Sequence, residues 1–114
     1  MGCERIGVRK LDYYVNNPRA VIIDLRDSSE YKKGHVKQAI NVPYKDFDKL
    51  FHVNGRNIYI NGEKFDMNNI YVCYCKRGAT SLMVCSQMSE YGLNVKSVVG
   101  GFFHYNGKFL VNNA

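Results

Sequence analysis

Four short runs of apolar residues have the length and residue types of buried β-strands. They cover residues 21–25, 39–42, 70–74 and 95–99, and β-branched or aromatic side chains are frequent in them. The run at 21–25 is almost continuously apolar, which is typical of a parallel strand covered on both faces. The four runs therefore predict a buried, mainly parallel β-sheet.

The segments between these strands carry signals for helices. Residues 27–30 resemble a helix start, Gly34 can end that helix, and the apolar residues within 47–51 fit one helical face. In residues 80–91 a helical stripe is formed by Leu82, Val84, Cys85, Met88 and Tyr91. The alternation of strands and helices predicts an α/β fold with a mainly parallel sheet.

One segment departs from this alternation. Asn61-Gly62 lies between two strand-like runs, and this dipeptide suits a type I′ turn because both of its residues tolerate positive φ. Asn54-Gly55 marks another turn just before it. The sequence therefore predicts a small β-hairpin near residues 57–66.

Composition narrows the class of protein. A chain of 114 residues predicts one domain, residues 1–114, and 46% hydrophobic with 23% charged residues is ordinary for a globular domain. No apolar run in the sequence approaches the length needed to span a membrane. No apolar leader begins the chain, so we expect a cytoplasmic protein without a membrane partner.

The net charge of +6 raises nucleic acid as a possible partner. The 16 lysines and arginines are nevertheless spread along the whole chain, with no cluster larger than a pair. We therefore expect no nucleic acid, and attraction of small anions explains the charge as well.

The four cysteines do not form the dense pattern of a disulfide scaffold. Cys3 stands alone, and Cys85 falls on the helical stripe, where we expect it in the core. Cys73 and Cys75 are two residues apart and could form a redox pair. No recognised ligand spacing supports a zinc site.

Cys75 follows the strand at 70–74 and opens a tight turn into a helix, at the sheet edge where α/β proteins bind ligands. Backbone N–H groups of such a turn, the helix N-terminus and the charges of Lys76 and Arg77 would all favour a thiolate. Spacing alone leaves two interpretations open, a nucleophile and a half-buried structural thiol.

A longer set of motifs resembles the rhodanese-like domain family. The match covers about residues 6–106, in the family's order and spacing. The matching segments are 22–26, Glu30-Tyr31, 34–36, 39–43, Tyr74-Cys75, Thr80-Ser81, 92–95 and 98–101. The resemblance implies a rhodanese-like fold, with a mainly parallel central sheet of about five strands flanked by helices on both faces.

The resemblance also implies a sulfurtransferase. Cys75 would carry a persulfide, taking sulfur from a donor such as thiosulfate and passing it to cyanide, a thiol or a sulfur-relay protein. Neither a metal nor an organic cofactor is implied. The substrate-binding loop would consist of Lys76, Arg77, Gly78, Ala79, Thr80 and Ser81.

Loop length separates this chemistry from that of related families. The family's sulfur-handling members have a six-residue loop counted from the cysteine, which Cys75 to Thr80 matches. Related phosphatases and arsenate reductases have a longer loop that ends in arginine, where Ser81 stands here. The sequence departs from the commonest pattern at Thr80, where many relatives have arginine, and at His104-Tyr105, where they often have tryptophan.

Other polar residues of the motifs are expected to be structural. Arg26 should pair with an acid and tie a strand exit to the following helix, in company with Asp24 and Glu30. His35 should bind backbone groups. Alternative functions remain a protein-binding module without catalysis and a thiol-disulfide redox protein using Cys73 and Cys75.

Overall fold

The central sheet has five strands, all of them parallel. The computed structural model describes residues 2–111, and its main sheet has the order β1-β9-β8-β2-β4. The strands are β1 (Glu4–Ile6), β2 (Ala20–Asp24), β4 (Ile40–Asn41), β8 (Ile70–Tyr74) and β9 (Asn94–Val98). The predicted α/β fold with a parallel sheet of about five strands is confirmed.

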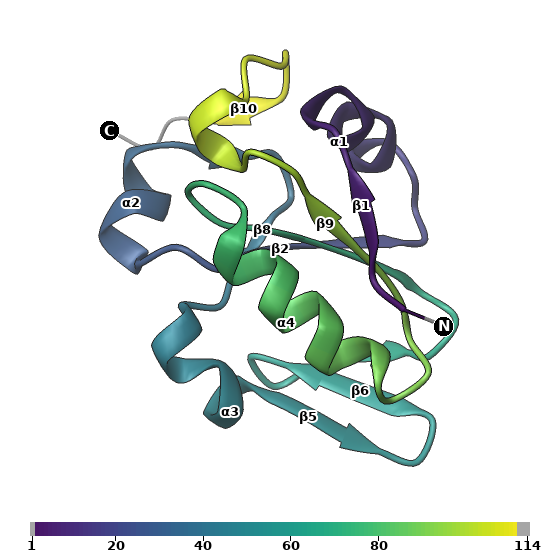
Figure 1. Ribbon diagram of the computed structural model, residues 1–114. Helices are drawn as coiled ribbons and strands as arrows, with labels where there is room; N and C mark the ends of the chain where they lie inside the picture. The colour runs from purple at the N-terminus through teal and green to yellow at the C-terminus, as the bar shows by residue number, and fades with distance from the viewer. Residues whose placement is uncertain (1, 112–114) are drawn as a thin grey trace.

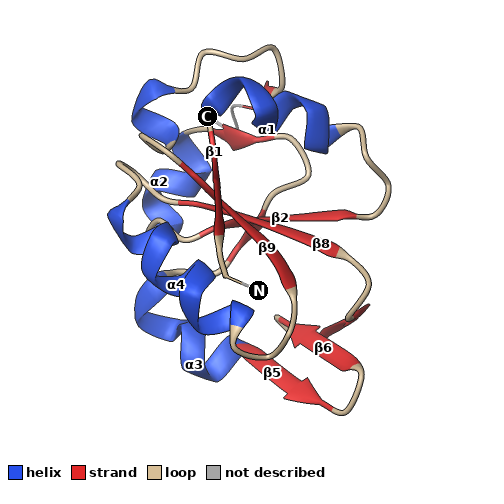
Figure 2. Cartoon of the chain, turned by 45° about the vertical axis from the view of Figure 1, so that its right-hand side comes forward, coloured by secondary structure: helices blue, strands red, loops and turns tan. Residues whose placement is uncertain are grey.

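Helices cover both faces of this sheet (Figures 1 and 2). Helix α1 packs on one face, and α4 packs on the other together with α3. The helices are α1 (Val8–Val15), α2 (Ser28–Lys33), α3 (Phe47–Leu50) and α4 (Ala79–Ser89), with 3₁₀ turns η1 (Tyr44–Asp46) and η2 (Phe102–His104). Among residues 2–111, no helix has the length and apolar character needed to cross a bilayer.

The two faces hold two separate cores, and strand alternation assigns side chains to them. On β8 and just beyond it, Tyr71, Cys73 and Cys75 belong to the core under α3 and α4, whereas Val72 and Tyr74 belong to the core under α1. Period-two alternation of this kind follows from strand geometry. It places Cys73 and Cys75 on the same face of the sheet.

The predicted hairpin is present as part of a larger antiparallel sheet. Strands β6 (Asn57–Ile60) and β7 (Glu63–Asp66) are joined at Asn61-Gly62, where φ is 53° and 81°. A further strand, β5 (Phe51–Asn54), pairs with β6 through a turn at Gly55. Phe51 was expected on a helical face, but it begins strand β5. Its buried side chain belongs to the apolar side of this small sheet.

The structure differs from the helical stripe and the strand set that the sequence predicts, and it adds β1 and α1, which were not predicted. The buried side of α4 is formed by Ser81, Val84, Cys85 and Met88, while Leu82 and Tyr91 are exposed. A two-stranded antiparallel pair, β3 (His35–Val36) with β10 (Leu110–Val111), was not predicted. Both strands have only two residues, too few to show a period.

Candidate active site

Cys75 lies at the carboxyl end of β8, where the sheet meets α4. Its Sγ accepts the backbone N–H groups of Gly78 at 3.1 Å and of Ser81 at 3.3 Å. The residue is 6% exposed, and it lines a cavity of about 320 Å³. A sulfur surrounded by N–H donors at a helix start is positioned for negative charge to be stabilised.

The turn that creates this arrangement depends on Gly78. Its φ of 107° is a conformation that side chains rarely adopt, and a Cβ there would lie 3.0 Å from the backbone nitrogen of Gly100. The Gly78 carbonyl accepts the N–H of Leu82 and begins α4. Glycine therefore permits both the tight turn and the close approach of the segment at Gly100.

The segment around Gly101 is hydrogen-bonded to the backbone at the start of the loop. The Cys75 carbonyl accepts the N–H of Phe102 at 2.8 Å, and the Lys76 carbonyl accepts that of Phe103 at 2.9 Å. A Cβ on Gly101 would lie 2.5 Å from the Cys75 carbonyl oxygen. The paired glycines thus let one backbone lie directly against another and fix the position of Cys75.

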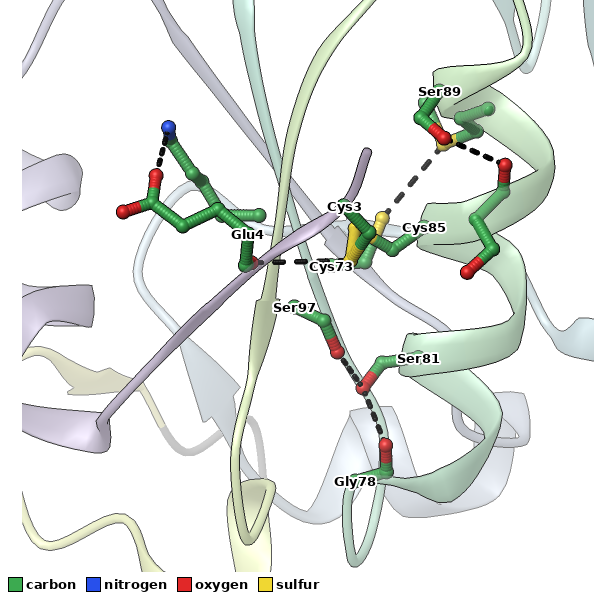
Figure 3. The surroundings of a disulfide bond; sticks show 11 residues. Cys3, Glu4, Cys73, Gly78, Ser81, Cys85, Ser89 and Ser97 are labelled. Atoms are coloured by element: carbon green, nitrogen blue, oxygen red, sulfur yellow. Dashed lines mark hydrogen bonds and ion pairs between the residues drawn. A yellow bond between two sulfur atoms is a disulfide. The ribbon is translucent and has the colours of Figure 1, made fainter. Parts of the chain in front are cut away.

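A buried pair of hydroxyl groups attaches the first turn of α4 to the sheet. Ser81 Oγ donates to the Gly78 carbonyl at 3.2 Å and lies 2.9 Å from Ser97 Oγ on β9 (Figure 3). Both serines are almost fully buried. The two buried hydroxyl groups are hydrogen-bonded to each other, which attaches the start of α4 to β9. In this position the backbone N–H of Ser81 points at the Cys75 sulfur.

The predicted ion pair of Arg26 is confirmed, with Asp24 as its partner at 2.7 Å. Asp24 also accepts the hydroxyl group of Tyr74, and Arg26 Nη2 donates to the Gly34 carbonyl, the residue that ends α2. Burial alone would lower the pKa of Arg26, but hydrogen bonding and the charge of Asp24 outweigh it and raise this pKa. Burial and the charge of Asp24 raise the pKa of Tyr74.

The six loop residues do not all face the Cys75 cavity. Lys76 and Thr80 line it, together with Arg26, Glu30 and Tyr44 among others. Gly78 and Ser81 contribute backbone N–H groups. Arg77 and Ala79 line a different hollow, and the guanidinium of Arg77 lies 4.7 Å from the ring centre of Phe103. Of the two cations expected to attract a donor, Lys76 is therefore the one at the cavity.

Two of the cysteines form a disulfide bond that the sequence analysis did not predict. Cys3, just before β1, forms a disulfide with Cys85 in α4, across 82 residues of sequence (Figure 3). Cys85 is fully buried, as expected, but the sequence analysis assigned no partner to Cys3, which is isolated in the sequence. No local signal links residues so distant in sequence, because only the fold brings β1 alongside β9 and α4.

Cys73 and Cys75 are both free, with no bond between them. Cys73 is completely buried, and its sulfur contacts that of Met88 at 3.8 Å. Burial, and to a lesser degree the charge of Cys75, raise the pKa of Cys73 to about 12. Cys73 is therefore a core thiol rather than a resolving partner for Cys75.

His35 has the structural position that the sequence predicts. Its Nδ1 contacts the Tyr31 carbonyl at 2.9 Å, and its ring stacks on that of Tyr31. Within residues 2–111, no three His, Cys, Asp or Glu side chains are grouped closely enough to hold a metal ion.

Comparison with known families supports the assignment that the motifs suggested. The family model described as rhodanese-like domain matches residues 8–108, which include the Cys75 loop and the Gly100-Gly101 segment. The chain belongs to the rhodanese-like domain family. A crystal structure of a rhodanese-like domain protein from Staphylococcus aureus has a TM-score of 0.73 at 22% identity, covering 97% of this chain and 99% of that one.

Two curated relatives show the range of proteins that contain such a domain. A tRNA uridine(34) hydroxylase from Buchnera aphidicola is 28% identical over 88% of this chain, and a tRNA sulfurtransferase from Thermoplasma acidophilum is 38% identical over 65% of it. The chain spans 31% and 12% of their lengths. In both relatives the matching region is one part of a longer protein, and one of the two is named a sulfurtransferase.

Proposed function

We propose that this chain, as one rhodanese-like domain, is a sulfurtransferase that carries sulfur as a persulfide on Cys75. One observation carries the proposal: the Cys75 sulfur lies at a cavity and accepts two backbone N–H groups, from Gly78 and Ser81. Such donors stabilise an anionic sulfur both before and after it gains a second sulfur.

The proposed reaction has two steps. With thiosulfate, the Cys75 thiolate attacks the outer sulfur, the sulfur–sulfur bond of the donor breaks, and sulfite leaves with the bonding electrons. In the second step a cyanide ion, a thiol or the cysteine of a sulfur-relay protein attacks the terminal sulfur and regenerates the Cys75 thiolate. Lys76 would attract the anionic donor, since it is the loop cation at the cavity.

Intact-mass measurement under non-reducing conditions tests the proposal. Wild type should gain one sulfur atom after incubation with thiosulfate and lose it on addition of cyanide, with thiocyanate formed. Cys75→Ser should gain none. Cys73→Ser is the matched control, because this second free thiol lies outside the cavity; it should load like wild type.

Iodoacetamide labelling separates the remaining outcomes. A reactive Cys75 that gains no sulfur from thiosulfate would redirect the search to polysulfides or protein persulfides as donors. An unreactive Cys75 would overturn the enzyme proposal and favour a protein-binding module.

The cytoplasm is the proposed location, and the Cys3–Cys85 pair provides a check on it. Reducing systems of that compartment keep most thiols reduced. Quenching cells with acid and alkylating agent should therefore trap Cys3 and Cys85 as thiols if the protein is cytoplasmic.

A further inference from the structure

The end of α4 that lies away from Cys75 borders a cavity that the proposed reaction does not use. This cavity has a volume of about 500 Å³, and no residue that lines it also lines the Cys75 cavity. Its walls come from α3, the start of β5 and the end of α4, which lie next to one another in both views (Figures 1 and 2). The volume lies within the range of small-ligand pockets, roughly 300–1,000 Å³, so an organic molecule fits there.

The cavity has an apolar floor with two aromatic rings set at an angle. Phe47, Phe51 and Met88 line it and are buried, whereas Tyr91 is 54% exposed at its edge. The ring centres of Phe51 and Tyr91 are 6.1 Å apart, and their planes are inclined by 57°. The faces of aromatic rings attract cations, in particular organic ammonium groups. This floor therefore suits an apolar body that carries a positive charge.

The charged residues of the cavity are acidic, although the chain as a whole has a net charge of +6. Asp48 and Glu90 line it, and no lysine or arginine in the described part of the chain does. Neither carboxylate forms an ion pair there, not even Asp48 with Lys45, which line a neighbouring hollow together. His52 also lines the cavity, but its Nε2 already lies 2.7 Å from the Lys49 carbonyl oxygen. Both carboxylates are thus available to a cation of a bound molecule.

The backbone of α4 adds negative potential at the same place. This helix has 11 residues and ends at Ser89, next to the lining residues Met88 and Glu90. The carboxyl end of a helix carries roughly half a negative charge, which lysine or arginine in the last turn commonly offsets. The last turn of α4 contains no basic residue. The positive end of α4 therefore faces the Cys75 sulfur, and its negative end faces this second cavity.

We propose that this cavity is a second binding site, which takes an organic cation of low molecular mass with an ammonium group attached to an apolar body. The ammonium group would lie between Asp48 and Glu90 and against the ring of Tyr91. The apolar body would rest on Phe51 and Met88. A free molecule is the occupant because a single basic side chain of a partner protein would fill only part of the cavity. The inference does not depend on the persulfide chemistry of the first site.

Binding is tested by NMR titration of the ¹⁵N-labelled protein with phenethylamine, phenethyl alcohol and hydrocinnamate. The three probes share a phenyl group on a short chain and are cationic, neutral and anionic at neutral pH. Contacts with two carboxylates and one ring should make the amine bind about tenfold more tightly than the alcohol, and the anion should bind most weakly. The amide signals that shift should belong to residues 47–53 and 87–91. Added salt should remove most of the advantage of the amine, because exposed charges are screened.

Variants assign the preference for the cation to residues. Asp48→Asn and Glu90→Gln retain the shape of each side chain, so each should weaken amine binding about threefold and leave alcohol binding unchanged. Tyr91→Ser should also weaken amine binding about threefold. Glu63→Gln is the matched control, because Glu63 is an exposed carboxylate on β7 that lines neither cavity and should not affect any probe.

The outcomes decide the inference separately from the proposed function. Equal affinity for the three probes would overturn the cation site, and so would amine binding that neither Asp48→Asn nor Glu90→Gln weakens. Amide shifts confined to the Cys75 cavity would overturn it as well. Loading of Cys75 by thiosulfate is measured on the same variants and should match wild type, since none of the substituted residues lines the Cys75 cavity.

Discussion

Replacing Gly101 with alanine tests whether the segment at Gly100-Gly101 positions the Cys75 sulfur. At Gly101 φ is 66° and ψ is −166°, a combination that is almost restricted to glycine. The added Cβ would lie 2.5 Å from the Cys75 carbonyl oxygen and 2.7 Å from the carbonyl carbon of Lys76. These are backbone atoms, so no side-chain rotation relieves the contact.

The size of the effect follows from these distances. Ordinary contact begins at 3.4 Å, so the Cys75–Lys76 peptide must retreat by about 0.9 Å or the whole segment must move. Misplacement of a reacting group by about 1 Å costs on the order of a hundredfold in rate. Backbone strain and loss of the Phe102 hydrogen bond should lower the free energy of unfolding by about 3 kcal/mol.

Gly55→Ala provides the matched control. Its φ of 63° is close to that of Gly101, but nothing lies within 4 Å of the position of its Cβ. This variant should lose about 1 kcal/mol of unfolding free energy in urea and retain the wild-type rate of persulfide formation. If Gly101→Ala forms the persulfide as fast as Gly55→Ala, the glycine segment does not position Cys75.

Three further predictions concern stability and reactivity. Because the Cys3–Cys85 disulfide closes an 82-residue separation, its reduction, or Cys3→Ser, should lower the free energy of unfolding by about 4.5 kcal/mol. Reducing the Cys3→Ser variant should lower it no further than either change alone. An unchanged urea midpoint would contradict the disulfide. Tyr74→Phe removes a hydroxyl that donates to Asp24 and accepts the N–H of Val36, so it should cost about 2 kcal/mol, whereas exposed Tyr13→Phe should cost almost nothing. Burial raises the pKa of Cys73 to about 12, so iodoacetamide at pH 8 should label Cys75 but not Cys73 until urea unfolds the chain; labelling of Cys73 in the folded protein would show that its site is open.

The parts of the fold that the sequence predicts are those with strong local signals. Strand β8 is an apolar run and β2 is one up to its last residue, Asp24, and Asn61-Gly62 specifies its turn through φ. The position of Cys75 after β8, ahead of the glycine turn, is likewise readable along the chain. The roles of the loop side chains cannot be read along the chain, because the direction in which each side chain points depends on packing. Arg77, for example, lies over Phe103, which is 26 residues later in the sequence.

The missed elements are short or depend on distant partners. Strand β1 has three residues, two of them exposed, so it shows no apolar run. Helix α1 does carry a usable signal, since its buried residues Leu11, Tyr14 and Val15 have helical spacing. The disulfide of Cys3 has no such signal, because β1 reaches α4 only after pairing in parallel with β9.

The arrangement of the sulfur atoms argues for transfer to an external acceptor rather than an internal disulfide. Cys73, Cys85 and Met88 lie in one apolar core, with Cys3 packed against it. Cys75 alone among the cysteines lines the cavity beside Lys76 and Thr80. A redox protein would need a second reactive thiol within reach of Cys75, but Cys73 is held protonated by burial and Cys85 is fully buried in the core. We therefore expect the proposed persulfide on Cys75 to pass its sulfur to a molecule that enters the cavity.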